Sequence, residues 1–122
     1  MPGPGSPGLP LTVLSGHLAS CAGDLVEGIG TGRPAAGELA TALTDLVGAQ
    51  RQIAAALAGL AENLRDQHAA GGMAAMPSPD LTALTEILSA AACASGCASQ
   101  ALAETAPMMA VLVESTRGDA AP

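Results

Sequence analysis

The sequence contains no Phe, Tyr or Trp among its 122 residues, and its four basic residues are all arginines. Without aromatic side chains, a core has to be built from Leu, Ile, Val and Met, which specify packing geometry less sharply. A nucleic-acid binder needs many cations to neutralise phosphates and usually aromatic rings to stack on bases. Because the net charge is −7, we expect this chain not to bind nucleic acid.

Strongly apolar runs are also missing. The longest uncharged stretch within an expected helix, residues 87–103, is mostly Ala, Ser, Cys and Gly. It falls short of the ~20 strongly apolar residues that a spanning helix needs, so we expect no membrane span. The first twenty residues contain no Lys or Arg, as a signal peptide would require, although residues 18–21 superficially match a lipoprotein cleavage box. We therefore expect a cytoplasmic location, with a secreted protein or a lipoprotein as the alternative.

The most regular pattern lies in residues 34–68, where large apolar residues recur at alternating spacings of three and four. This spacing predicts a helix that packs lengthwise against another helix. The flanking positions, which are usually charged in a two-stranded coiled coil, are mostly alanine, so the apolar face is broad and favours a bundle. On one flank lie Ala40, Val47, Ala54 and Ala61. The predicted seam consists of Leu39, Leu43, Leu46, Gln50, Ile53, Leu57, Leu60 and Leu64.

Proline and glycine mark the ends of the other helices. A first helix is predicted to begin at Pro10 and to end among the glycines at 28, 30 and 32. The long helix is predicted to stop near His68, before two consecutive glycines. A third helix spans residues 79–117, with a kink near residues 104–106 because Pro107 removes a backbone N–H and clashes with the preceding turn. We expect Arg117 and Gly118 to close that helix.

Together these elements predict an all-α fold: an antiparallel hairpin of the second and third helices plus a shorter first helix, in a three-helix bundle with a fourth segment after Pro107. Residues 9–117 form the predicted domain, and residues 1–8 and 118–122 are predicted to be disordered tails. One register of the hairpin places large residues opposite small ones and brings Gln50 near Ser95 and Ser99. These two hydroxyls could then satisfy its amide, which would be costly to bury alone.

Three cysteines raise the question of a metal site. Cys93 and Cys97 are four residues apart, as are His17 and Cys21, so each pair projects two potential ligands from one side of a helix. In an up-down-up bundle, however, Cys21 falls beside Thr105, ~12 Å from Cys97, and the four ligands do not converge. An odd number of cysteines and a cytoplasmic location favour free thiols over disulfides.

The sequence supports no enzymatic activity and no cofactor, since its acidic residues are scattered on predicted outer surfaces. We expect a non-catalytic helical module for protein–protein interaction or oligomerisation. A thiol-based metal-binding bundle is the first alternative, and a small secreted helical-hairpin protein is the second. Because the first helix is too short to cover the loop end of the hairpin, we expect a protein partner or a second copy to bind there. The predicted partner-binding residues are Leu57, Leu60, Leu64, Leu84, Ile87, Leu88, Met73 and Met76.

Overall fold

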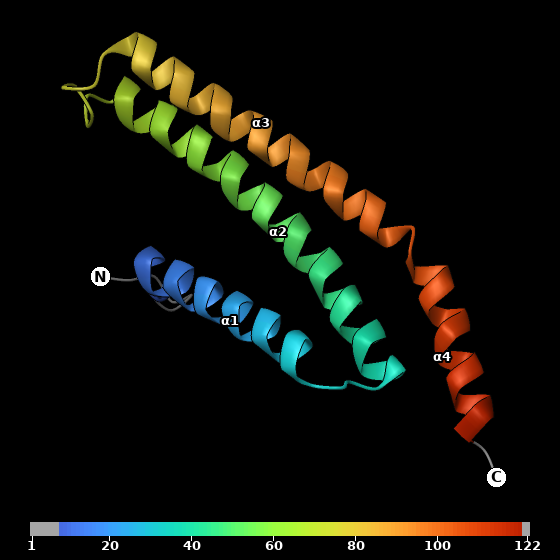
Figure 1. The fold of residues 1–122 in the computed structure, drawn as a ribbon. Helices are drawn as coiled ribbons and strands as arrows, with labels where there is room; N and C mark the ends of the chain where they lie inside the picture. The colour runs from blue at the N-terminus through green and yellow to red at the C-terminus, as the bar shows by residue number, and fades with distance from the viewer. Residues whose placement is uncertain (1–7, 121–122) are drawn as a thin grey trace. The chain divides into compact units, whose positions relative to one another are not determined.

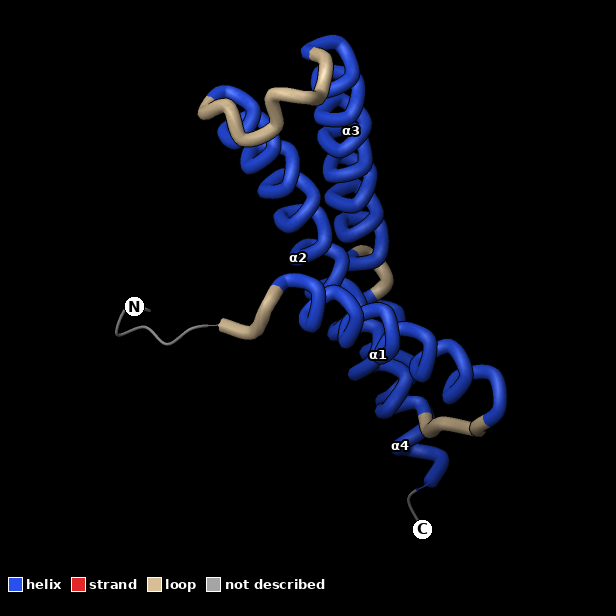
Figure 2. Tube along the Cα trace, turned by 90° about the vertical axis from the view of Figure 1, so that its left-hand side faces the viewer, coloured by secondary structure: helices blue, strands red, loops and turns tan. Residues whose placement is uncertain are grey.

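The computed structural model describes residues 8–120, and within this range it contains only helices and the loops between them (Figures 1 and 2). The all-α prediction is therefore confirmed. The helices are α1 (Leu11–Thr31), α2 (Ala36–Ala69), α3 (Ser78–Ala103) and α4 (Ala106–Ala120). The chain divides into two compact units, one containing α1 and ending at Ala35, the other beginning at Ala36 and containing α2, α3 and α4. Most of the predicted N-terminal tail, residues 1–7, lies outside the described residues.

Helix α1 begins and ends where the sequence predicts. The backbone N–H groups of Val13 and Leu14 bond to the Pro10 carbonyl, at 3.0 and 3.1 Å. At the other end, the N–H of Gly32 bonds to the Gly28 carbonyl at 3.0 Å, and the chain then becomes extended. Every side chain of α1 is exposed within the structure. Local signals thus define both ends of this helix.

Helix α2 ends in a Schellman motif, as its two following glycines predict. Gly71 adopts a φ of +87°, which favours glycine because it has no Cβ. The N–H of Gly72 bonds to the Gln67 carbonyl at 2.8 Å, and the N–H of Gly71 bonds to the His68 carbonyl at 3.1 Å. The half-buried His68 also reaches across the loop, with its Nε2 3.2 Å from the carbonyl oxygen of Met76. Since a carbonyl can only accept, Nε2 carries the proton in this bond.

The third predicted helix is divided in two. Helix α3 begins at Ser78-Pro79 with Asp80 in its first turn, and it ends at Ala103. The chain bends at residues 104–105 before α4 begins, which confirms the predicted kink (Figure 1). Its cause is Pro107, which lacks the N–H that would bond to the Ala103 carbonyl in a continuous helix. Helix α4 continues to Ala120, so the prediction that the helix closes at Arg117 and Gly118 is wrong.

Helix α2 packs antiparallel against α3 and α4, as the predicted hairpin requires (Figure 1). The hydroxyl of Ser99 on α3 donates a 3.3 Å hydrogen bond to the backbone carbonyl of Val47 on α2. Two heptads nearer the loop on each helix lie Ala61 and Thr85, which are 1% and 3% exposed. Midway between these pairs lie Ala54 and Ala92, both half-buried. The two helices therefore make their closest approach along a line of mostly small residues at heptad spacing.

This contact line corrects the predicted seam. The predicted seam contains Leu60, with Ala61 on its flank, whereas in the structure Leu60 is 47% exposed and Ala61 is buried. Small residues allow the helix backbones to approach closely, and the leucines are then displaced to one side of the contact. The expected role of Ser99 is also wrong in detail, because its hydroxyl bonds to the Val47 carbonyl and not to the Gln50 amide.

Candidate interaction surface

The contact line divides the α2–α3 pair into two faces. Because the helices run antiparallel, residues one or four positions before the contact residues lie on the same side of the pair on both helices. Large apolar residues occupy most of these positions, with Gln50, Ala91, Ser95 and Ala98 at the others. We call this surface the apolar face, and it consists of Leu39, Leu46, Ile53, Leu57, Leu60, Leu64, Leu84, Leu88 and Leu102, with Ile87, two positions after Thr85, at its outer border.

The opposite surface is polar. There the guanidinium of Arg65 on α2 lies 3.5 Å from the hydroxyl of Ser89 on α3 and 3.5 Å from a carboxylate oxygen of Glu62. The Glu62 and Arg65 side chains are 72% and 45% exposed, so solvent screens this ion pair and it adds little stability. The distribution of side chains therefore makes the α2–α3 pair amphipathic as a unit, with one face suited to water and one suited to another apolar surface.

The structure places all eight predicted partner-binding residues around the loop half of the hairpin. Leu60 and Ile87 are exposed, at 47% and 66%. Met73 and Met76 lie in the loop between α2 and α3. The remaining predicted residues and both loop methionines are half-buried: Leu57, Leu64, Leu84, Leu88, Met73 and Met76. Whether these residues bind a partner stays a prediction.

The loop between α2 and α3 lies at the end of the hairpin (Figure 1). Short backbone bonds hold it, among them the N–H of Met76 to the carbonyl of Met73 at 3.0 Å. Leu81, at the start of α3, is 8% exposed. Farther along the helices, Leu60 and Ile87 remain open despite this turn. The loop therefore does not cover the apolar face.

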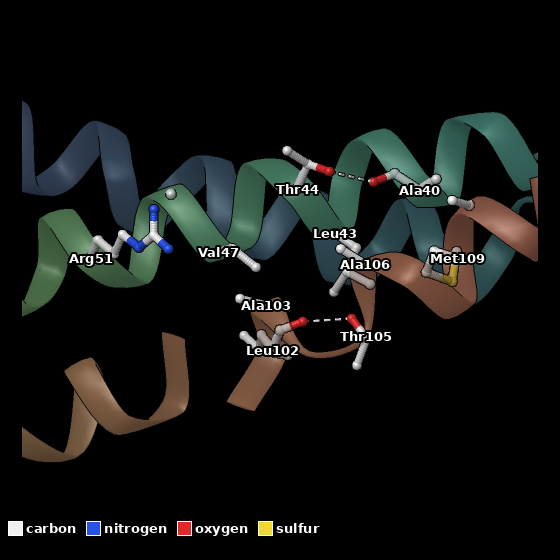
Figure 3. Close-up of a pocket in the computed structure, with 12 residues that line it drawn as sticks. Ala40, Leu43, Thr44, Val47, Arg51, Leu102, Ala103, Thr105, Ala106 and Met109 are labelled. Carbon is white, nitrogen blue, oxygen red and sulfur yellow. Dashed lines mark hydrogen bonds between the residues drawn. The ribbon is translucent and has the colours of Figure 1, made fainter. Parts of the chain in front are cut away.

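A second surface feature lies at the bend, where α4 turns away from the line of α3. A groove of about 480 Å³ opens there between α2 and the α3–α4 junction (Figure 3). Arg51 lies at one end of it and Met109 at the other (Figure 3). The Thr44 and Thr105 hydroxyls at its wall bond to carbonyls of Ala40 and Leu102, so neither donor is free for a ligand. The lining is Ala40, Leu43, Thr44, Val47, Gly48, Arg51, Leu102, Ala103, Thr105, Ala106, Met109 and Ala110.

Sequence reasoning anticipated the bend but not this groove. Pro107 signals a break in the helix, yet it does not fix the direction in which the following helix leaves. The lining is mostly apolar, with a single cation, and no catalytic pair of side chains meets there. The simplest interpretation of the groove is a gap that the bend opens between packed helices.

The candidate metal ligands do not form a cluster. Cys21 Sγ lies 3.7 Å from His17 Nε2 on α1. Cys93 and Cys97 are exposed on α3. Within the described residues, no group of three or more His, Cys, Asp or Glu side chains is placed to hold a metal ion. Metal binding by these thiols is an alternative that solution measurements have to test.

Comparison with known proteins adds no assignment. No family model, curated protein or solved structure matches this chain.

The joined α3–α4 segment also bears on membranes. Within the described part of the chain, residues Ser78–Arg117 include one stretch that is long and apolar enough to span a membrane by length and composition alone. Only 11% of that stretch is buried in the structure. The middle of α3 is nevertheless built mainly from Ala, Ser, Cys and Gly, which are weakly apolar. The expectation that the chain has no membrane span stays a prediction.

Proposed function

We propose that this protein is a non-catalytic helical module that binds another protein surface through the apolar face. One observation carries the proposal. Among residues 8–117, whose side chains are described, only two apolar residues are buried, Ala61 and Leu81. Large apolar side chains such as Leu60 and Ile87 remain open.

The hairpin leaves most of its large apolar side chains incompletely buried. Full burial of a leucine-sized side chain stabilises a protein by ~1.5–3 kcal/mol, and a half-buried one gains only part of this. Single domains are stable by only about 5–15 kcal/mol, so leaving a whole row of leucines half-exposed removes much of that margin. A partner that covers the apolar face would restore it. The module would then fold fully, or become stable, only with its partner in place.

The arrangement of polar groups also supports a non-catalytic role. The ion pairs formed by described residues, Glu62–Arg65 and Glu114–Arg117, join exposed side chains on single helices. No described side-chain N or O atom is buried without a hydrogen-bond partner. Catalytic sites usually hold their polar side chains in strained or desolvated surroundings. The side-chain bonds that cross between helices, from Ser99 to Val47 and from Arg65 to Ser89, join the two helices of the hairpin.

Capture of partners from lysate of the source organism tests this proposal. The tagged full-length chain is compared with a face variant, Leu60→Glu/Ile87→Glu, and with a control, Ala55→Glu/Thr82→Glu, which places the same charges at exposed positions outside the apolar face. Wild type and control should retain the same protein, whether a second copy or another chain. The face variant should lose it by about a hundredfold or more, because an unpaired charge is costly to bury. Equal retention by all three would contradict the proposal.

A further inference from the structure

We infer that the surface which covers the apolar face is the apolar face of a second copy of this chain. The inference rests on the proposed function, since it names the partner of the same surface. It joins two α2–α3 pairs face to face in a symmetric dimer with four helices at its centre. Two features of the hairpin favour a second copy over a different partner.

The first feature is the size of the face. Helix α3 has 26 residues, which gives the pair a length of ~39 Å at the usual rise per residue. Two adjacent helices of ~10 Å diameter make it ~20 Å wide, so one face offers ~800 Å². A stable interface of standard size buries about 800 Å² on each partner. Two copies packed face to face therefore reach the area of a stable dimer without any other chain.

The second feature is charge. The chain carries a net charge of −7, so two copies repel each other unless they meet through a neutral surface. The apolar face is neutral along residues 39–64 of α2 and 81–102 of α3. The charged residues within those spans lie on the polar surface or at its edge: Asp45, Arg51, Glu62 and Glu86. A basic partner would find no acidic residues on the apolar face to pair with, whereas a second copy meets no like charge there.

The borders of the face allow the close approach that such a dimer needs. On α2 the outer border carries Ala42, Ala49 and Ala56, and on α3 it carries Ala94 beside Ile87. Alanine at these flanking positions lets a neighbouring helix lie close to either edge. The exposed Leu60 and Ile87 stand near the outer limits of the face, where contacts across the layer would cover them. A two-fold dimer uses the same patch on both subunits, so each residue would be covered twice.

Sedimentation equilibrium on the full-length chain, over a wide range of concentration, tests the inference. Wild type should have twice the chain mass of 11.7 kDa. Leu60→Glu/Ile87→Glu should sediment at the monomer mass, while the control Ala55→Glu/Thr82→Glu should remain dimeric. A dimer that persists in the face variant would overturn the inference, because its interface would then lie elsewhere.

Because the charged variant could unfold, Leu60→Ala/Ile87→Ala provides a second measurement. Alanine preserves helix formation and removes only contact area. The dissociation constant of the dimer should rise by about tenfold for each truncated side chain. An unchanged constant in this variant would also overturn the inference.

A wild-type monomer at all concentrations would overturn the second copy as partner but not by itself the proposed function. Fluorescence of an apolar dye such as anilinonaphthalene sulfonate separates the two. Strong dye binding that Leu60→Glu/Ile87→Glu abolishes would mean that the face is open and that a different protein covers it. A monomer without dye binding would contradict both the inference and the proposed function.

Discussion

The two ends of the hairpin use similar residues but pack differently. Toward the loop, Ala61, Leu81 and Thr85 are each less than a tenth exposed, and the helices meet closely. Toward the bend, Ala40 on α2 and Ala103 and Ala106 at the α3–α4 junction are among the residues that line a groove of about 480 Å³. Small residues line both ends. The difference therefore does not come from the size of the side chains at the contact.

The continuity of the helix accounts for the difference. Along the loop end, α3 remains unbroken beside α2, so its small residues stay on the contact line. At residues 104–105 the bend changes the direction of the chain, and the small residues of α4 no longer follow that line. Small residues thus permit close packing, whereas an uninterrupted helix axis is what maintains it. Three experiments test this comparison.

The largest effect is expected from Ala61→Asp, which breaks the tight end. A carboxylate at this buried position has no cation to pair with on the contact line, and the hairpin should lose about 3 kcal/mol or more. Chemical denaturation followed by circular dichroism, at fixed protein concentration, measures the loss. Ala55→Asp, at an exposed position of the same helix, is the control and should change the midpoint little. Equal losses in both variants would mean that Ala61 is not at the contact.

A smaller effect is expected when the same enlargement is made at both ends. Ala61→Leu forces the helices apart at the tight end and should cost about 1–3 kcal/mol. Ala103→Leu places the added atoms in the groove and should be neutral or slightly stabilising. Thermal melting of the two variants at equal concentration compares them directly. If Ala103→Leu is as damaging as Ala61→Leu, the two ends are packed alike and the comparison fails.

The smallest effect is expected from Pro107→Ala, which tests the cause of the difference. Alanine restores the N–H that can bond to the Ala103 carbonyl and so allows α3 to continue through the bend. The gain should be about 1 kcal/mol, because Pro107 already lies in the first turn of α4, where proline is tolerated. Amide hydrogen exchange at residues 104–107 should slow. Unchanged exchange there would show that another interaction holds the bend.

Much of the fold could be predicted because its boundaries depend on local chemistry. Pro10, Gly71 and Pro107 act through their own backbone restrictions, so each determines a helix end or a bend without knowledge of the rest of the chain. The antiparallel hairpin followed from the periodicity of the leucines. These signals need only the sequence near each residue.

The contact line could not be predicted in the same way. The period-seven pattern identified the leucine-rich side of α2, and large residues were taken to mark the centre of the contact. In the structure Ala61 lies at the centre and Leu60 beside it, because small residues on both helices allow the backbones to approach closely there. Likewise, the acceptor of the Ser99 bond is a backbone carbonyl, which sequence patterns do not distinguish. The partner surface depends on what covers the leucines, so it was a prediction from the sequence and is a proposal from the structure.

The loop between α2 and α3 has a consequence for register. Small residues recur every seven positions along the contact line, so sliding one helix by a heptad, ~10.5 Å, again sets small residues opposite each other. The contact line itself therefore discriminates poorly between these alignments. The turn at Gly71 and the bond from His68 to the Met76 carbonyl keep the connection compact. A compact connection cannot supply the extra length that a shift by one heptad needs. The loop therefore selects one alignment of α2 and α3.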